Sequence, residues 1–353
     1  LTATFDSNDG SADPVRLAAR TARVFLGLRI DCLQCHNDFL GNVNLGDAPD
    51  LREGTQQDFH QLAAFFTSAK TNGLQGVKDG EVDYSYKYLN DEEETDVKAA
   101  VPFLSELLPA TGKPRARLAA WVTHSENHQA ARAAVSHVWA LMFGRSMGNA
   151  VDNLPLDEWE HPMMDSLARD FVQHDFDLRR LIRVIAASQA FSADSRAAFE
   201  ITPEHERNFA VFPLVRLRPE QVAGAIIQAA RIKTTDRESS FFLQLQTMAG
   251  TNDFVTQYGD VGEDEFNSDS ITVTQRLLMM NGKLLRELVE ANPLLNTSAH
   301  VGMFAESNEQ IVQLLYVAML NRYPTTEELQ HFVSRIECSE DSDEAVEDLA
   351  WIL

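Results

Sequence analysis

The sequence predicts a mainly α-helical, multi-helical protein with long irregular loops and little or no sheet. Apolar residues recur at helical spacing through most of the chain, and many of these segments open on typical helix-start residues. Alternating patterns typical of β-strands are scarce, and the best candidate is the short segment 254–258. At 353 residues, the chain has room for two domains of common size.

The N-terminal part of the chain contains two expected helices joined by a loop. The first begins at Asp13-Pro14, a capping residue with Pro at the first helical position. Residues 37–54, rich in Asn, Asp and Gly, are expected to form a long loop, and a second helix is expected over 57–69. Segment 71–95 has little order signal and ends in acidic residues, so we expect a domain boundary near residue 100.

The rest of the chain is predicted to form successive helices. They are expected over 114–124, 127–143, 162–174, 177–191, 219–232, 271–291, 308–320 and 325–337. Pro219 and the run Thr325-Thr326-Glu327-Glu328 are typical helix starts. Residues 233–270 are polar and acidic and are expected to be irregular. We therefore expect a domain over residues 1–100 and a second, helical domain over residues 101–353.

The composition is strongly acidic, with 53 Asp and Glu against 30 Lys and Arg and a formal charge of −23. Such a surface repels phosphate backbones, so we expect no nucleic acid partner. No run approaches the roughly 20 apolar residues of a membrane-spanning helix, so no transmembrane segment is expected. Residues 1–4 lack the features of a signal peptide, and we expect the numbering to begin after processing or inside a longer chain.

The most specific chemical pattern is Cys32-x-x-Cys35-His36, which follows the first apolar helical run. Two thiols at this spacing can form thioethers with one haem c, and the adjacent imidazole can bind its iron as the proximal ligand. Two of the three cysteines of the chain belong to this motif. The same spacing also occurs in redox disulfides and in zinc sites, so a disulfide, a dithiol or a zinc site remains open.

The sixth iron ligand would decide what a haem protein does. A Met or His ligand gives an electron carrier, whereas an open position permits catalysis or ligand binding. The candidates are His161 and Met142. His161 lies at a helix start and could instead cap that helix, and Met142 could instead pack in the core. His60 could reach back toward the motif from the second helix, although we favour an exposed position for it.

Residues on both sides of the first loop form a pattern known from a family. They are Arg23, Phe25, Leu26, Gly27, Cys32, Cys35 and His36, followed by Gln57, Asp58, Phe59, Leu62, Ala64, Phe65 and Phe66. In order and spacing they resemble the planctomycete cytochrome C-like domain, of which residues 1–100 would be the C-terminal part. The family has a second His shortly after the motif, but this chain reads His36-Asn37-Asp38-Phe39 without it, so no role of that His is carried over.

The second part of the chain resembles the domain of unknown function that habitually follows this cytochrome-like domain. The matching segments are 115–122, 138–139, 143–145, 161–162, 181–182, 216–217, 220–221, 278–282, 315–316 and 321–329. The resemblance therefore covers nearly the whole chain in the same order.

The motif and the resemblance together favour an exported c-type cytochrome with one covalently bound haem. Cys32 and Cys35 would supply the thioethers and His36 the proximal ligand. The protein would exchange electrons with a redox partner protein in the periplasm or cell envelope, where haem c is attached, and we favour a homodimer over a monomer. Two alternatives remain: a haem enzyme with an open iron site, and a non-haem helical interaction protein whose Cys32 and Cys35 form a disulfide or bind a metal.

Overall fold

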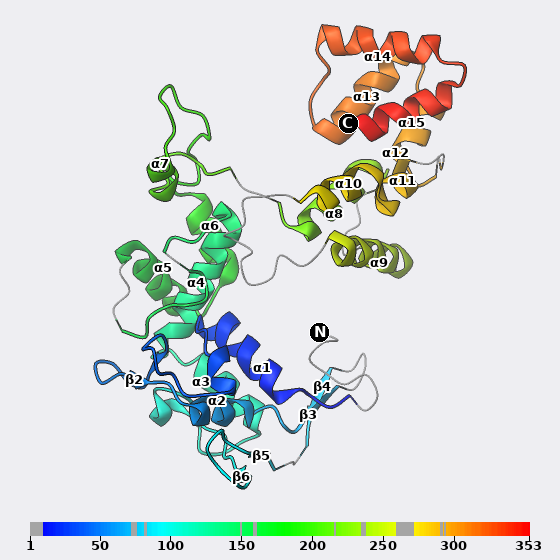
Figure 1. Cartoon of the computed structure of the whole chain (residues 1–353). Coiled ribbons are helices and arrows are strands. Elements are labelled where there is room, and N and C mark those ends of the chain that lie inside the picture. The colour runs from blue at the N-terminus through cyan, green and yellow to red at the C-terminus, as the bar shows by residue number, and fades with distance from the viewer. Residues whose placement is uncertain are drawn as a thin grey trace. The chain divides into compact units, whose positions relative to one another are not determined.

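The computed structural model is mainly α-helical, as the sequence predicts (Figure 1). The structure describes residues 10–71, 76–80, 83–148, 150–157, 161–214, 217–233, 238–258, 272–289, 292 and 294–353. The chain divides into two units, Leu1–Val215 and Arg216–Leu353.

The first unit opens with α1 (Pro14–Thr21), which the Asp13 side chain caps by accepting the backbone N–H of Arg16. A π-helical turn over Ala22–Leu26 continues it and ends at Gly27, whose φ of 60° lies in the left-handed region. A Cβ atom at Gly27 would also lie 2.9 Å from Leu154 Cδ1. The position therefore requires glycine for two reasons, and the chain turns there toward the motif.

The strands of the described residues form three small antiparallel hairpins in the first unit. These are β1 (Asn44–Leu45) with β2 (Arg52–Glu53), β3 (Ala69–Thr71) with β4 (Val77–Asp79), and β5 (Ser85–Tyr86) with β6 (Thr95–Asp96). Helix α2 (Gln56–Ala63) follows β2 and is shorter than the helix expected over 57–69.

A first core cluster joins α1, α2 and α3 (Pro114–Val122). Its large, fully buried side chains include Leu26, Leu33, Phe59 and Trp121. Residues on both sides of position 100 share this cluster, so the predicted boundary near residue 100 lies inside the first unit. The division of the sequence into two families near residue 100 stays a prediction.

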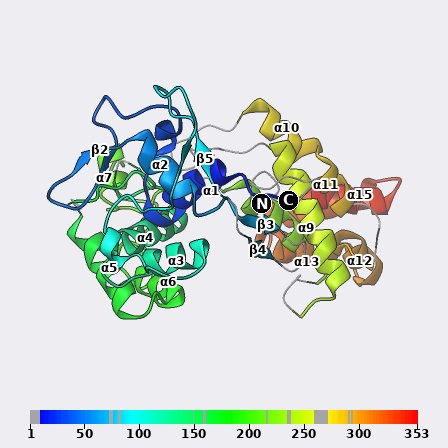
Figure 2. The ribbon, with the colours of Figure 1, turned by 90° about the horizontal axis from the view of Figure 1, so that it is seen from below.

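A second core cluster of the first unit lies among α4 (His128–Phe143), α5 (Pro162–Gln173) and α6 (Leu178–Ala186). These helices lie together in both views of the ribbon (Figures 1 and 2). Trp139 stacks on Phe143 with ring centroids 4.2 Å apart and meets Phe209 edge-on at 5.1 Å. The short α7 (Pro203–Arg207) precedes Phe209.

The regular elements among the described residues of the second unit are all helices. Its helices are α8 (Pro219–Ala230), α9 (Phe241–Tyr258), α10 (Val273–Asn281), α11 (Lys283–Val289), α12 (Thr297–Phe304), α13 (Asn308–Leu320), α14 (Thr326–Cys338) and α15 (Ser342–Ile352). Its largest cluster of buried apolar side chains joins α12 to α15 around Val312, Leu315 and Tyr316. Smaller clusters join α8 to α9 and α11.

Two local predictions are wrong in this unit. The segment 254–258, our best strand candidate, belongs to α9, so most of the described part of the segment 233–270, expected to be irregular, is helical. Residues 234–237 and 259–271 lie outside the described residues. Phe254 and Tyr258 are four residues apart and pack together on Val222 and Ala223 of α8, which is helical spacing. The helix expected over 271–291 is interrupted at Gly282, which adopts extended backbone angles.

Candidate functional site

The Cys-x-x-Cys-His motif lies on a short 3₁₀ helix, Asp31–Gln34, and the turn that follows it. The backbone N–H groups of Cys35 and His36 both donate to the Cys32 carbonyl, at 3.2 and 3.4 Å. Cys32, Cys35 and His36 are exposed, whereas Leu33 between them is fully buried in the first core cluster. The turn therefore anchors itself by Leu33 and leaves its three reactive side chains accessible.

The His36 ring is oriented by its neighbour. Nδ1 lies 2.7 Å from the carbonyl oxygen of Asn37, which can only accept, so Nδ1 carries the hydrogen and Nε2 has a free lone pair in the neutral ring. Metal-binding histidines are typically held by a hydrogen bond of this kind from the second ring nitrogen. His36 therefore meets the requirement for an iron ligand through Nε2.

Two apolar side chains next to the motif are exposed. Phe39, which is 72% exposed, stacks beside the His36 ring with centroids 6.4 Å apart, and Leu40 is 83% exposed. Exposed large apolar side chains that are adjacent in this way are suited to cover an apolar group. They provide a second feature that fits a haem at this place.

The two motif cysteines are free thiols. Partial burial raises the pKa of the Cys32 thiol above its ordinary value of 9.0, and the nearby carboxylate of Asp38 raises it further. Cysteines that exchange disulfides have lowered pKa values, because the thiolate is the nucleophile. The electrostatics at Cys32 therefore do not favour the dithiol alternative.

The Gln34 carbonyl, between the two cysteines, is the polar anchor of the turn. It accepts hydrogen bonds from Gln56 Nε2, His60 Nε2 and Tyr86 Oη, each at 3.1 Å. His60 is 1% exposed, so the interpretation of an exposed histidine is wrong. His60 does reach back to the motif, where its Nε2 contacts the Gln34 carbonyl oxygen. Its ring is stacked on the Tyr86 ring, with centroids 3.4 Å apart.

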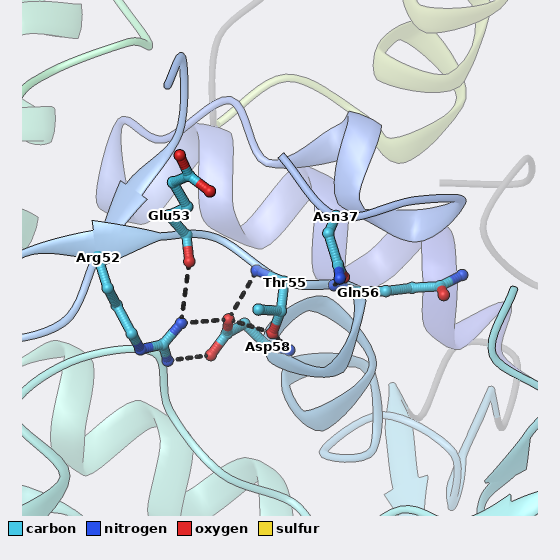
Figure 3. Close-up of polar contacts among 6 residues, drawn as sticks. All are labelled: Asn37, Arg52, Glu53, Thr55, Gln56 and Asp58. Carbon is cyan, nitrogen blue, oxygen red and sulfur yellow. Dashed lines mark hydrogen bonds and ion pairs between the residues drawn. The ribbon is translucent and has the colours of Figure 1, made fainter. Parts of the chain in front are cut away.

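The loop that follows His36 is tied to the start of α2 by the polar contacts in Figure 3. The Asn37 side chain accepts the backbone N–H of Gln56 at 2.8 Å. Arg52 donates to both carboxylate oxygens of Asp58, at 2.8 and 2.6 Å. Asp58 also accepts the backbone N–H and hydroxyl of Thr55, which completes a capping box at this helix. These contacts fix both ends of the loop.

A second ionic network ties the segment before the motif to a distant part of the chain. Asp152 accepts hydrogen bonds from Arg23 at 2.9 Å and from Arg29 at 2.7 Å, so both arginines share one carboxylate. The Asp152 side chain is only 16% exposed, which strengthens these contacts relative to surface pairs. The motif therefore depends on residues well outside the segment 1–100.

The sixth-ligand candidates have different surroundings from the motif. Met142 packs against the second core cluster, whereas the motif borders the first. His161 directly precedes α5, and its Nε2 lies 3.3 Å from the position that a Cβ atom at Gly148 would occupy. As iron ligands, both residues stay predictions.

Two further features concern metals and membranes. Among the described residues, no group of three or more His, Cys, Asp or Glu side chains is arranged to hold a metal ion. None of the described helices combines the length and the apolar character that crossing a membrane requires.

The fold and the site together define a mainly helical protein with an accessible Cys-x-x-Cys-His motif. Residues 114–253 match the family described as "PSD1: Protein of unknown function (DUF1553)". The expected resemblance to a domain of unknown function is thereby confirmed over these residues, which run from the start of α3 into α9. No curated protein and no solved structure matches the chain.

Proposed function

We propose that this chain is a c-type cytochrome that carries one covalently bound haem. Cys32 and Cys35 would hold the group through thioethers, and His36 would bind its iron through Nε2. The observation that carries the proposal is the turn itself, which exposes all three side chains and commits His36 Nδ1 to the Asn37 carbonyl. When bound, haem c supplies a one-electron couple.

Three further observations support this assignment. Both motif thiols are free, which speaks against a disulfide and is what thioether formation requires. Partial burial and the Asp38 carboxylate raise the pKa of the Cys32 thiol, which is the opposite of what a disulfide-exchanging cysteine needs. The exposed Phe39 and Leu40 provide an apolar border for a large apolar ring.

The role that we propose is electron transfer to or from a redox partner protein after export to the periplasm or cell envelope. The formal charge of −23 would favour a partner with a cationic docking surface and would make association sensitive to salt. A homodimer that brings two haems together is the assembly that we favour.

The proposal is tested by producing the protein together with c-type haem maturation and denaturing it before haem detection. We expect haem to stay on the wild-type chain and on Cys338→Ser, the third and exposed cysteine, but to be absent from the double variant Cys32→Ser/Cys35→Ser. Absence of haem from the wild type, while a control cytochrome matures, would contradict the proposal.

The spectrum of the loaded protein separates electron transfer from the alternative of a haem enzyme. A sharp reduced α-band would indicate a six-coordinate iron and support the electron carrier. A broad high-spin spectrum with carbon monoxide binding to the reduced protein would favour an open iron site. Substitution of Met142 or His161 by Ala would then show whether either supplies the sixth ligand.

A further inference from the structure

Three side-chain donors from two elements converge on a single backbone oxygen inside the motif. Gln56 and His60 come from α2, and Tyr86 comes from β5. Each places its donor 3.1 Å from the Gln34 carbonyl. A carbonyl oxygen has two lone pairs, so the three donors share them and leave no accepting capacity unused. The peptide between Gln34 and Cys35 therefore has little freedom to rotate.

His60 is the central member of this group because both of its ring nitrogens have partners. The Gln34 carbonyl can only accept, so Nε2 carries the hydrogen, and Nδ1 therefore accepts the Tyr84 hydroxyl at 2.8 Å. The ring is stacked on Tyr86 and meets Tyr88 edge-on. A neutral imidazole in one tautomer is thus locked between the tyrosines and the motif.

The side chains of the tyrosines reach His60 because they alternate along the segment 84–88, of which Ser85–Tyr86 forms β5. Tyr84, Tyr86 and Tyr88 are each partly buried, whereas Ser85 and Lys87 between them are exposed. This period of two places the three rings on one side of the segment, where all three contact His60 of α2. The arrangement gives a continuous polar connection from Tyr84 through His60 to the backbone of the motif.

We propose that His60 is the positioning residue of the Cys-x-x-Cys-His motif. Through the Gln34 carbonyl, it fixes the turn that presents Cys32, Cys35 and His36. The identity of the group that the turn receives rests on the proposed function, but the positioning itself concerns this chain alone.

The first test uses the reduced protein without haem and measures amide hydrogen exchange and thiol alkylation. We expect His60→Phe to raise the exchange rates of the Cys35 and His36 amides by about tenfold, since their bonds to the Cys32 carbonyl depend on the anchored turn. Iodoacetamide should react faster at Cys32, whereas Cys338 and the amides of α4 should be unchanged. His60→Gln, whose amide can still donate to the carbonyl, should restore wild-type values.

Two further variants complete the test. His128→Phe, at the exposed first residue of α4, is the matched control and should behave as the wild type. Tyr86→Phe removes a second donor to the same carbonyl without creating a cavity, and it should raise the same amide rates if His60→Phe does not fold. The proposal would be overturned if folded His60→Phe or Tyr86→Phe had the same amide exchange rates and the same Cys32 alkylation rate as the wild type.

The second test uses the haem-loaded protein and separates this proposal from the proposed function. We expect His60→Phe to shift the midpoint potential and lower the yield of attached haem, with both restored in His60→Gln. If the wild type attaches no haem, the proposed function fails, and the exchange and alkylation results still decide the role of His60. If haem attaches equally and at an unchanged potential in His60→Phe, the positioning role is wrong.

Discussion

Asp58 shows how a single buried residue supports the structure around the motif. Burial raises the pKa of its carboxyl, but hydrogen bonds from Arg52 and Thr55 outweigh this effect and hold the pKa below the ordinary value of 3.8. Because the folded-state pKa is depressed, the ionised carboxylate stabilises the protein above the unfolded-state pKa. This stabilisation is lost as the pH falls through the lower, folded-state value.

We therefore expect Asp58→Asn to lower the free energy of unfolding by about 1–3 kcal/mol at pH 7. The difference between the variant and the wild type should shrink as the pH falls below about 4, where the wild-type carboxyl also becomes protonated. Urea unfolding of both proteins at pH 7 and pH 3 measures this difference. Asp50→Asn, at an exposed position of the same loop, is the control, and an equal loss in both variants would contradict the explanation.

His60 also makes the stability of the fold depend on pH, but through burial of a neutral imidazole rather than through an ionised carboxylate. Burial lowers its pKa from the ordinary 6.5, and the groups that face it are the three phenols of Tyr84, Tyr86 and Tyr88. The unfolded chain therefore binds a proton at a higher pH than the folded chain does, so stability decreases as the pH falls below about 6.5. Between pH 7.5 and pH 5, the free energy of unfolding measured with denaturant should decrease less in His60→Gln than in the wild type. The same pH dependence in both proteins would contradict this explanation.

Of the residues around the motif, some could be recognised from the sequence and others could not. The motif itself was recognisable because its five residues are contiguous. The burial of His60 was not, since its partners Gln34 and Tyr86 lie 26 residues away on each side, and helical periodicity does not report such contacts. The alternation of Tyr84, Tyr86 and Tyr88 was the one signal that could have indicated it.

At the scale of elements, helix starts were well predicted because caps are local. Helices α3, α5, α8 and α13 begin at the expected residues: the first three open on a Pro, and the Ser307 side chain caps α13. Helix α14 begins at a capping box of Thr325 and Glu328, and Arg322 further holds Glu328 through both carboxylate oxygens. At α9, β-branched and aromatic residues made the local propensity misleading. At Gly282, the apolar pattern continues across a glycine that in fact ends the helix.

Gly27 provides a test of the turn that leads into the motif. We expect Gly27→Ala to lower the free energy of unfolding by about 2–4 kcal/mol, because left-handed strain adds to a collision with Leu154. Gly41→Ala is the matched control, since Gly41 has a φ of 71° but no atoms within 4 Å of the added Cβ. It should cost only the strain of about 1–2 kcal/mol. Urea unfolding measures both variants. An equal loss of unfolding free energy in the two would show that the contact with Leu154 costs nothing.

At the scale of the whole molecule, each unit contains its own cores. Every residue of the two clusters around α1 to α6 belongs to the first unit, as do Asp152 and the motif. We expect a fragment ending at Val215 to unfold cooperatively and to retain the alkylation rates of Cys32 and Cys35. Circular dichroism and mass spectrometry check this, with the full chain as control, and a fragment without a cooperative transition would contradict it.

The fold class could be predicted from the sequence, but the division into units could not. Low order signal over 71–95 indicated a boundary, yet that segment lies between parts of the chain that share Leu26, Phe103 and Trp121 in one core. Composition reports how a segment is solvated, whereas a structural unit is defined by which distant side chains are buried together.

The arrangement of Trp121 has a practical consequence for anyone who produces part of this protein. Its indole N–H donates to the Leu104 carbonyl at 3.1 Å, and its ring lies 4.9 Å from that of Phe103. An expression clone cut at the limits of the family match would begin at residue 114 and lack both partners. Such a clone would expose the Trp121 ring together with Leu118 and Val122, the buried residues of the first core cluster that it retains. Its insolubility would therefore say nothing about the stability of the natural chain.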